Sequence, residues 1–121
     1  MQERPNVIVD KTFEFALSII EFAEKLESIR KYVIANQILK SGTSIGANVR
    51  EAQNAESKAD FIHKMKIAAK EADETEYWLL LCQKSENYPD CEALQKEIKE
   101  IVRLLSKIIS SSKNKILTSS N

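Results

Sequence analysis

Residues 41–52 read Ser41-Gly42-Thr43-Ser44-Ile45-Gly46-Ala47-Asn48-Val49-Arg50-Glu51-Ala52, and they hold both glycines of the 121-residue chain. The segment continues a pattern in which inward positions recur every three or four residues, which predicts a helix. Gly42 and Gly46 lie four residues apart on one flank of it, and each costs about 1 kcal/mol relative to alanine in a helix interior. We therefore predict a notch where another chain segment packs closely. A phosphate-binding loop is disfavoured, because its lysine and a preceding strand are absent.

Two polar side chains of this segment are also predicted to point inward. Ser41 and Asn48 fall in phase with Ile38 and Ile45. An amide left unpaired in the interior would cost about 1 to 3 kcal/mol, so both residues need partners. We expect these partners to be Thr75 or carboxylates of the third helix, or water. A buried asparagine in a bundle commonly fixes register or oligomeric state.

The same spacing recurs along the chain and divides it into four helical segments. The predicted helices lie near residues 7–27, 30–55, 58–86 and 90–111, and a flexible tail rich in Ser, Asn and Lys covers 112–121. Only two glycines and two prolines interrupt the sequence. Short links imply antiparallel neighbours. The sequence thus predicts an all-α fold, an antiparallel up-down-up-down four-helix bundle, as a single domain over residues 1–121.

Several functional classes are disfavoured by what the sequence lacks. No apolar run approaches the roughly 20 residues that span a membrane, and the first residues lack a signal-peptide pattern, so we expect a cytoplasmic protein without membrane association. Cys82 and Cys91 belong to no Cys-x-x-Cys motif, which favours reduced thiols over a disulfide or a metal site. No serine or cysteine occupies a nucleophile-elbow context.

One constellation superficially resembles a carboxylate metal site. Asp60-x-x-His63 and Glu71-x-x-Glu74, together with Glu51, are similar to part of a ferritin-like centre, which requires Glu-x-x-His motifs on two helices. The chain has a single histidine, so a solvated acidic face is the favoured interpretation. We predict no catalytic residues, no metal, no cofactor and no enzymatic activity, with a carboxylate-metal enzyme as a rival hypothesis.

The formal net charge of zero conceals a separation of charge along the third helix. Residues 58–70 hold four lysines against one aspartate, whereas residues 71–86 hold five acidic residues against one lysine. In an antiparallel pair the start of the third helix lies beside the end of the fourth, where residues 103–115 hold four basic residues and no acid. One end of the bundle is therefore predicted to be basic.

The candidate polyanion-binding residues are Lys58, Lys64, Lys66, Lys70, Lys96, Lys99, Arg103 and Lys107. The last four form a helical stripe that could follow phosphates, although a solvated face is the favoured interpretation of that stripe. No aromatic residue interleaves with it. Binding of nucleic acid would therefore be mostly electrostatic and sensitive to salt.

Two stretches resemble a known bacterial family. Residues 44–52 and 67–79 are similar to the four-helix-bundle proteins encoded by intervening sequences of 23S rRNA genes, often labelled S23 ribosomal protein, and the resemblance covers nearly the whole chain. The family's Ser-Ile-x-x-Asn-Ile/Val-x-Glu-Gly motif is matched at Ser44, Ile45, Asn48, Val49 and Glu51, with Ala52 in place of the usual glycine. The motif and packing residues are Ser41, Gly42, Ser44, Gly46, Asn48, Glu51, Glu71 and Thr75.

This resemblance implies an up-down bundle that assembles as a ring-shaped homopentamer. A related branch, the accessory variability determinants of diversity-generating retroelements, looks like a basic barrel that binds nucleic acid and a reverse transcriptase, and the neutral charge of this chain departs from that branch. We hypothesise a non-enzymatic oligomeric bundle that binds or scaffolds a macromolecule, with RNA or DNA as one partner of its basic end. The alternatives are a protein–protein adaptor and, less favoured, the carboxylate-metal enzyme.

Overall fold

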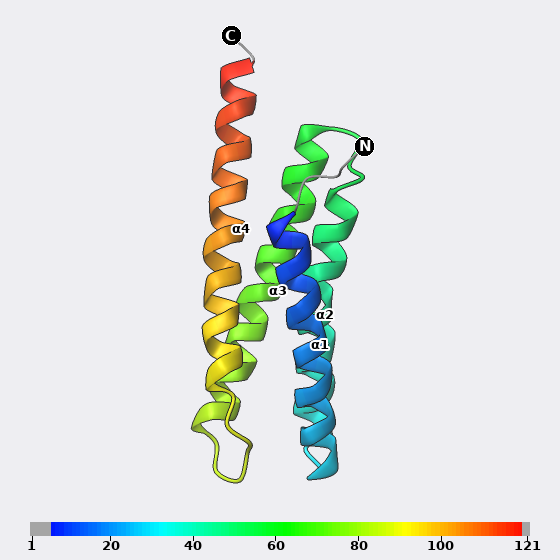
Figure 1. Ribbon diagram of the computed structural model, residues 1–121, viewed down its shortest axis with the longest axis vertical. Helices are drawn as coiled ribbons and strands as arrows, with labels where there is room; N and C mark the ends of the chain where they lie inside the picture. The colour runs from blue at the N-terminus through cyan, green and yellow to red at the C-terminus, as the bar shows by residue number, and fades with distance from the viewer. Residues whose placement is uncertain (1–5, 120–121) are drawn as a thin grey trace.

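The computed structural model describes residues 6–119, with side chains to residue 115, and within this range it contains four helices and no strand (Figure 1). The helices are α1 (Val7–Ser28), α2 (Tyr32–Ala52), α3 (Lys58–Lys84) and α4 (Glu92–Ser119). Each helix packs on the next, and α4 packs back on α1, whereas the diagonal pairs have no close backbone approach over the described residues. The antiparallel up-down-up-down four-helix bundle is confirmed.

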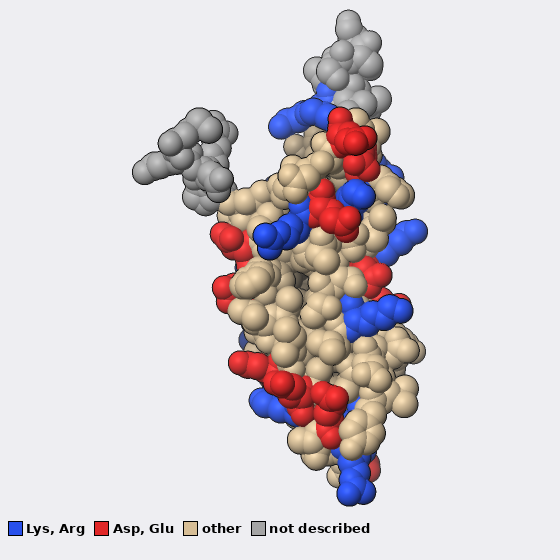
Figure 2. All heavy atoms as spheres, turned by 90° about the vertical axis from the view of Figure 1, so that its right-hand side faces the viewer, with Lys and Arg blue, Asp and Glu red and all other residues tan. Residues whose placement is uncertain are grey.

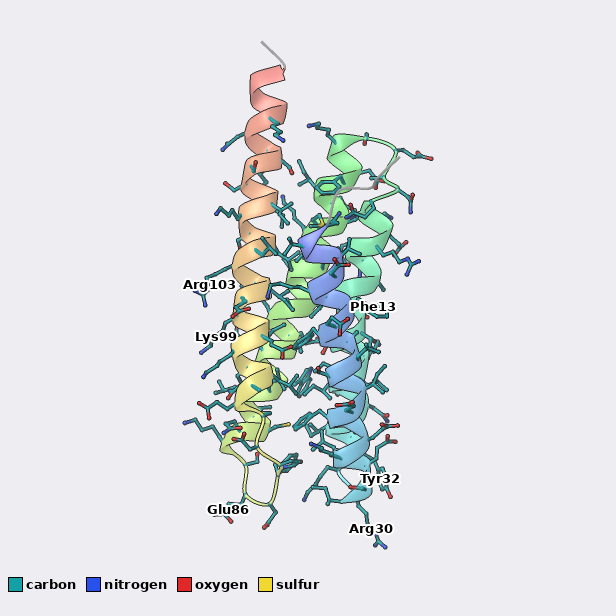
Figure 3. All side chains as sticks on the ribbon, viewed as in Figure 1. Phe13, Arg30, Tyr32, Glu86, Lys99 and Arg103 are labelled. Carbon is teal, nitrogen blue, oxygen red and sulfur yellow. The ribbon has the colours of Figure 1, made fainter. Side chains whose placement is uncertain are left out.

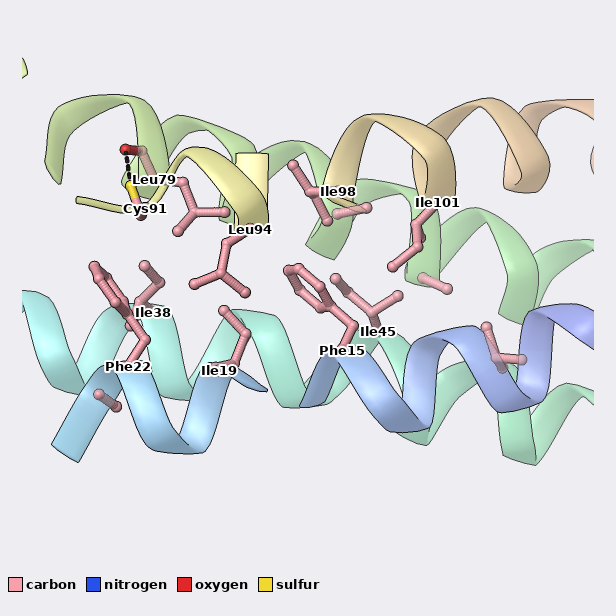
Figure 4. Packing of buried hydrophobic residues seen from close by; sticks show 14 of the residues in the cluster. Phe15, Ile19, Phe22, Ile38, Ile45, Leu79, Cys91, Leu94, Ile98 and Ile101 are labelled. Atoms are coloured by element: carbon pink, nitrogen blue, oxygen red, sulfur yellow. Dashed lines mark hydrogen bonds between the residues drawn. The ribbon is translucent and has the colours of Figure 1, made fainter. Parts of the chain in front are cut away.

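The interior is built from apolar side chains of all four helices (Figure 4). Phe15 and Ile19 of α1, Ile45 of α2, Leu79 of α3 and Ile98 of α4 are fully buried. Burying one such side chain contributes roughly 1.5 to 3 kcal/mol, so the inward stripes stabilise the bundle more than helix propensity does.

Local hydrogen bonds explain where three of the helices begin or end. The side chain of Ser57 accepts a bond from the Asp60 N–H (3.0 Å), as predicted for the start of α3. Between α1 and α2, Arg30 adopts a positive φ of 64°. The Lys31 N–H reaches back to the Leu26 carbonyl (2.8 Å), so the turn closes as a Schellman motif without the usual glycine.

The predicted helix limits differ from the observed ones mainly in α4. The helix predicted over 30–55 spans Tyr32–Ala52, and the one predicted over 58–86 ends at Lys84. The fourth helix begins at Glu92 instead of residue 90 and continues to Ser119 instead of ending near 111.

The late end of α4 has a simple backbone explanation. Residues 110–119 contain neither glycine nor proline, and the modest propensities of serine and asparagine do not stop a helix that is already formed. The predicted tail is therefore helical as far as Ser119, and its flexibility stays a prediction. Residues 1–5, on which the absence of a signal peptide was judged, and residues 120–121 lie outside the described range.

Candidate polyanion-binding surface

The two glycines of α2 form the predicted notch, and α1 fills it. A Cβ atom added at Gly42 would lie 2.8 Å from Cγ2 of the fully buried Ile19. One added at Gly46 would lie 3.2 Å from the carbonyl oxygen of Thr12. The glycines therefore set how closely α1 and α2 approach, and their role is packing.

A buried pair of hydroxyl groups joins α2 to α3. Ser41 and Thr75 are fully buried, and their hydroxyl oxygens share a hydrogen bond of 2.9 Å. Thr75 Oγ1 also bonds the carbonyl oxygen of Glu71, one turn earlier, at 2.7 Å. The predicted inward orientation of Ser41 and its pairing with Thr75 are confirmed.

The predicted inward orientation of Asn48 is wrong. Its side chain is half-buried, and Nδ2 donates to the Ser44 carbonyl of its own helix (2.8 Å) rather than to α3. Val49 takes the buried position instead. The reason is the helical repeat of 3.6 residues. After Ile45 the next inward position is four residues on, at Val49, whereas the prediction assumed a step of three residues, to Asn48.

The other motif residues of α2 face outward. Ser44 Oγ donates to the Lys40 carbonyl (2.7 Å). Glu51 is exposed, and its carboxylate lies 4.0 Å from Lys64 Nζ, at the limit of an ion pair. The family motif therefore combines inward packing residues with outward polar ones and forms no single site.

Glu71 lies at the edge of the α2–α3 contact in an environment that disfavours its charge. Desolvation, followed by the neighbouring carboxylate of Glu74, raises the pKa of Glu71, while Lys40 opposes the shift. The carboxyl group of Glu71 thus binds its proton more tightly in the native state than in the unfolded state. At pH values above the folded pKa the ionised carboxylate therefore destabilises the native state.

We expect Glu71→Gln to raise the free energy of unfolding at pH 7 by less than about 1 kcal/mol, because the group is partly solvated. The gain should disappear as the pH falls below the unfolded pKa of a glutamate, about 4.3. Urea unfolding of both proteins at pH 7 and pH 4 measures this difference. Glu24→Gln, on the exposed surface of α1, serves as the control. A variant destabilised at pH 7 would contradict this account of Glu71.

The extension of α4 brings two lysines together at one end of the bundle. The pKa of Lys66 on α3 is lowered, first by side-chain interaction with Lys113 of α4 and then by the repulsion between the two charges. Both side chains are exposed. The ion pairs of the described residues join Lys11 to Glu100 and Lys64 to Glu51, so neither Lys66 nor Lys113 has a carboxylate partner among them.

A second pair of lysines lies at the same end. Lys58 and Lys115 line one shallow groove, between the end of α2 and the last turns of α4, together with Ser57, Phe61 and Ser112. Lys113 and Lys115 are two residues apart on a helix, about 200° around its axis, so the two pairs lie on different sides of α4. We call Lys58, Lys66, Lys113 and Lys115 the α3–α4 basic end.

The remaining candidates are more dispersed. Lys70, Lys96 and Lys107 are exposed. Lys99 and Arg103 project from the outer side of α4 (Figure 3). Lys99 shares a groove with Asp73 and Glu76, which makes its surroundings mixed in sign.

Lys113 and Lys115 were missing from the predicted site, although the charge count over residues 103–115 included them. The expected end of the fourth helix near residue 111 placed both lysines in a flexible tail. The absence of glycine and proline after residue 110 was the signal that could have identified them as part of the helix.

Other chemistry has little structural support in the described part of the chain. Over these residues, no group of three or more His, Cys, Asp and Glu side chains is arranged to hold a metal ion. Burial raises the pKa of Cys82 to about 11 and that of Cys91 to about 12, so both thiols are protonated and weakly nucleophilic at neutral pH. None of the described helices is long and apolar enough to cross a bilayer.

Comparison with known proteins gives a consistent picture. The family model described as 23S rRNA-intervening sequence protein matches residues 4–107. A solved structure from Bacteroides thetaiotaomicron, a protein of unknown function from the S23 ribosomal protein family, is 48% identical to the chain. The match covers 84% of this chain and 97% of that one, with a TM-score of 0.80. A search of curated proteins finds no match.

Proposed function

The chain belongs to the family of 23S rRNA-intervening sequence proteins, and on that premise we propose that it is a non-enzymatic, oligomeric bundle that binds RNA or DNA through the α3–α4 basic end. The observation that carries this proposal is the gathering of exposed lysines at this end, where Lys58 and Lys115 line one groove and the nearby Lys113 lowers the pKa of Lys66. Two exposed ammonium groups near each other repel, and a phosphate between them would replace that repulsion with two attractions.

The character of this end favours recognition of the phosphate backbone over recognition of bases. The one aromatic residue among the described residues of its groove is Phe61, which is partly buried against the core. Base stacking requires exposed aromatic faces, whereas contacts between lysine and phosphate need only charge and reach. We therefore expect little sequence preference and a strong dependence on salt.

Assembly into a ring, as the family resemblance implies, would repeat the basic end in every protomer. Each protomer supplies four lysines at this end, and repeated weak sites on one particle bind a long polyanion with avidity. A modest site on one chain can thus serve an oligomeric RNA- or DNA-binding protein, even though the net charge of the chain is zero.

The salt dependence of binding tests this proposal. A structured rRNA fragment and a DNA duplex of equal length are titrated with the protein between 50 and 200 mM salt, with fluorescence anisotropy as the readout. Four phosphate contacts in one protomer predict a slope of log K against log salt of about −3.6 for the duplex. Absence of binding at 50 mM salt, or binding that does not change with salt, would contradict the proposal, and the second result would favour a protein adaptor.

A further inference from the structure

The outer flank of α1 carries apolar side chains that none of the residues described by the structure covers. Phe13, Leu17 and Ile20 are 54%, 45% and 40% exposed, although all three belong to a helix whose other face is in the core. Figure 2 shows the corresponding face of the molecule as a broad uncharged region with charges toward its margins. In Figure 3, Phe13 lies on the side of the bundle opposite to Lys99 and Arg103.

A groove between α1 and α2 gives this face a defined shape. Small residues, Ala16, Gly46 and Ala47, form part of its lining, so an aromatic ring can approach the backbone closely. Among the described residues that line it, only Arg50 is charged. The other lining residues are Val9, Phe13 and Thr43.

The α3–α4 side carries a smaller apolar surface of different chemistry. Tyr77 and Leu80 of α3 are 56% and 46% exposed. They line a groove with Asp73, Glu76, Gln95 and Lys99. The Tyr77 ring packs edge-on against Trp78, with ring centroids 5.5 Å apart, which restricts the orientation of an exposed aromatic side chain.

We propose that the α1–α2 groove of one copy receives Tyr77 and Leu80 of a second copy of this chain, a contact that rests on the oligomeric state proposed above. The lining of small residues suits an aromatic anchor, and aromatic anchors dominate interface energies. The charges are complementary in balance, because Arg50 at the groove would meet Asp73 and Glu76 beside the incoming tyrosine, and these two carboxylates outnumber the one lysine there, Lys99.

The positions of the two surfaces determine the type of contact. The α1–α2 and α3–α4 pairs form opposite sides of the bundle, since each helix packs only on its sequence neighbours and α4 packs on α1. Two different surfaces that complement each other make a head-to-tail contact, which closes into a ring when the rotation between successive copies adds up to a full turn. A symmetric dimer would instead use the same surface on both copies.

Two variants test the two halves of this contact separately. Ala47→Glu places a carboxylate in the groove opposite Asp73 and Glu76, and Tyr77→Ala removes the anchor. Both positions are exposed, so circular dichroism should show folded proteins. Light scattering at micromolar concentration should find an oligomer for the unmodified chain, and each variant should weaken association at least about thirtyfold. Val33→Ala, at an exposed apolar position outside both grooves, is the matched control and should leave the assembly unchanged.

Mixing the two variants gives the decisive result. The intact groove of Tyr77→Ala can still receive the intact Tyr77 of Ala47→Glu, so an equimolar mixture should form a one-to-one dimer. A monomeric unmodified chain would overturn the oligomeric state itself. The assignment of these surfaces would be overturned if both variants kept the oligomer of the unmodified chain. It would also be overturned if the variants dissociated but did not pair on mixing. In both cases the oligomeric state itself would still hold.

Discussion

Gly42→Val is expected to lower the free energy of unfolding by about 3 kcal/mol, the upper part of the range for overpacked cores. The first added atom, Cβ, would already lie 2.8 and 2.9 Å from Cγ2 and Cγ1 of Ile19. These atoms belong to a fully buried, β-branched side chain with little freedom to rotate away. Valine adds two further methyl groups, so α1 and α2 would have to move apart to accommodate it. Thermal or urea unfolding measures the loss.

The matching control is Gln37→Val, at an exposed position on the same helix. It carries the propensity cost of a β-branched residue without the clash, so its effect should stay below about 1 kcal/mol. In a background of Ile19→Ala, the cost of Gly42→Val should shrink, because the clashing side chain has been removed. Equal effects of valine at positions 37 and 42 would show that the α1–α2 distance does not depend on Gly42.

Reversing the charges of Lys66 and Lys113 together is expected to reduce RNA affinity about a hundredfold at 50 mM salt. The double variant Lys66→Glu/Lys113→Glu replaces two attractive groups with two that repel phosphate. Both side chains are exposed, so the fold should be retained. Fluorescence anisotropy across a salt series should also show a shallower slope, because fewer counterions are released.

Lys25→Glu supplies the control for a charge reversal elsewhere on the molecule. Lys25 is exposed in the last turn of α1, at the end of the bundle opposite to the α2–α3 turn. Its reversal should change affinity only slightly, through the summed charge of the chain. A similar loss from Lys25→Glu and from Lys66→Glu would mean that binding reports net charge and not this end of the bundle.

The sequence predicted those parts of the fold that depend on local pattern. The spacing of Phe15, Ile19 and Phe22 defined the buried face of α1, and Ser57 marked the start of α3. Gly42 and Ser41 were correctly assigned to packing. A glycine inside a helix and a buried hydroxyl group each cost free energy, so each residue needs a compensating contact. The identity of those contacts with Ile19 and Thr75 depends on how the helices cross, which a single helical pattern does not specify.

The incorrect parts of the sequence prediction have physical causes. Asn48 was assigned inward by a spacing that drifts from the true helical repeat over several turns. The turn at Arg30 uses a left-handed conformation that sequence patterns associate with glycine. The basic end was predicted from a charge count that included Lys113, but Lys113 was left out of the candidate site, because the fourth helix was expected to end near residue 111 and instead continues through a run of serines.

The most direct test of the central proposal is lysine labelling of the unmodified protein with and without a bound rRNA fragment. Acetylation read by mass spectrometry reports the accessibility of each ammonium group and needs no substitution. We expect RNA to protect Lys66 and Lys113, whereas Lys25 and Lys84, at the other end of the bundle, should be labelled as in the free protein. Protection of Lys25 and Lys84 with Lys66 and Lys113 left fully reactive would contradict it.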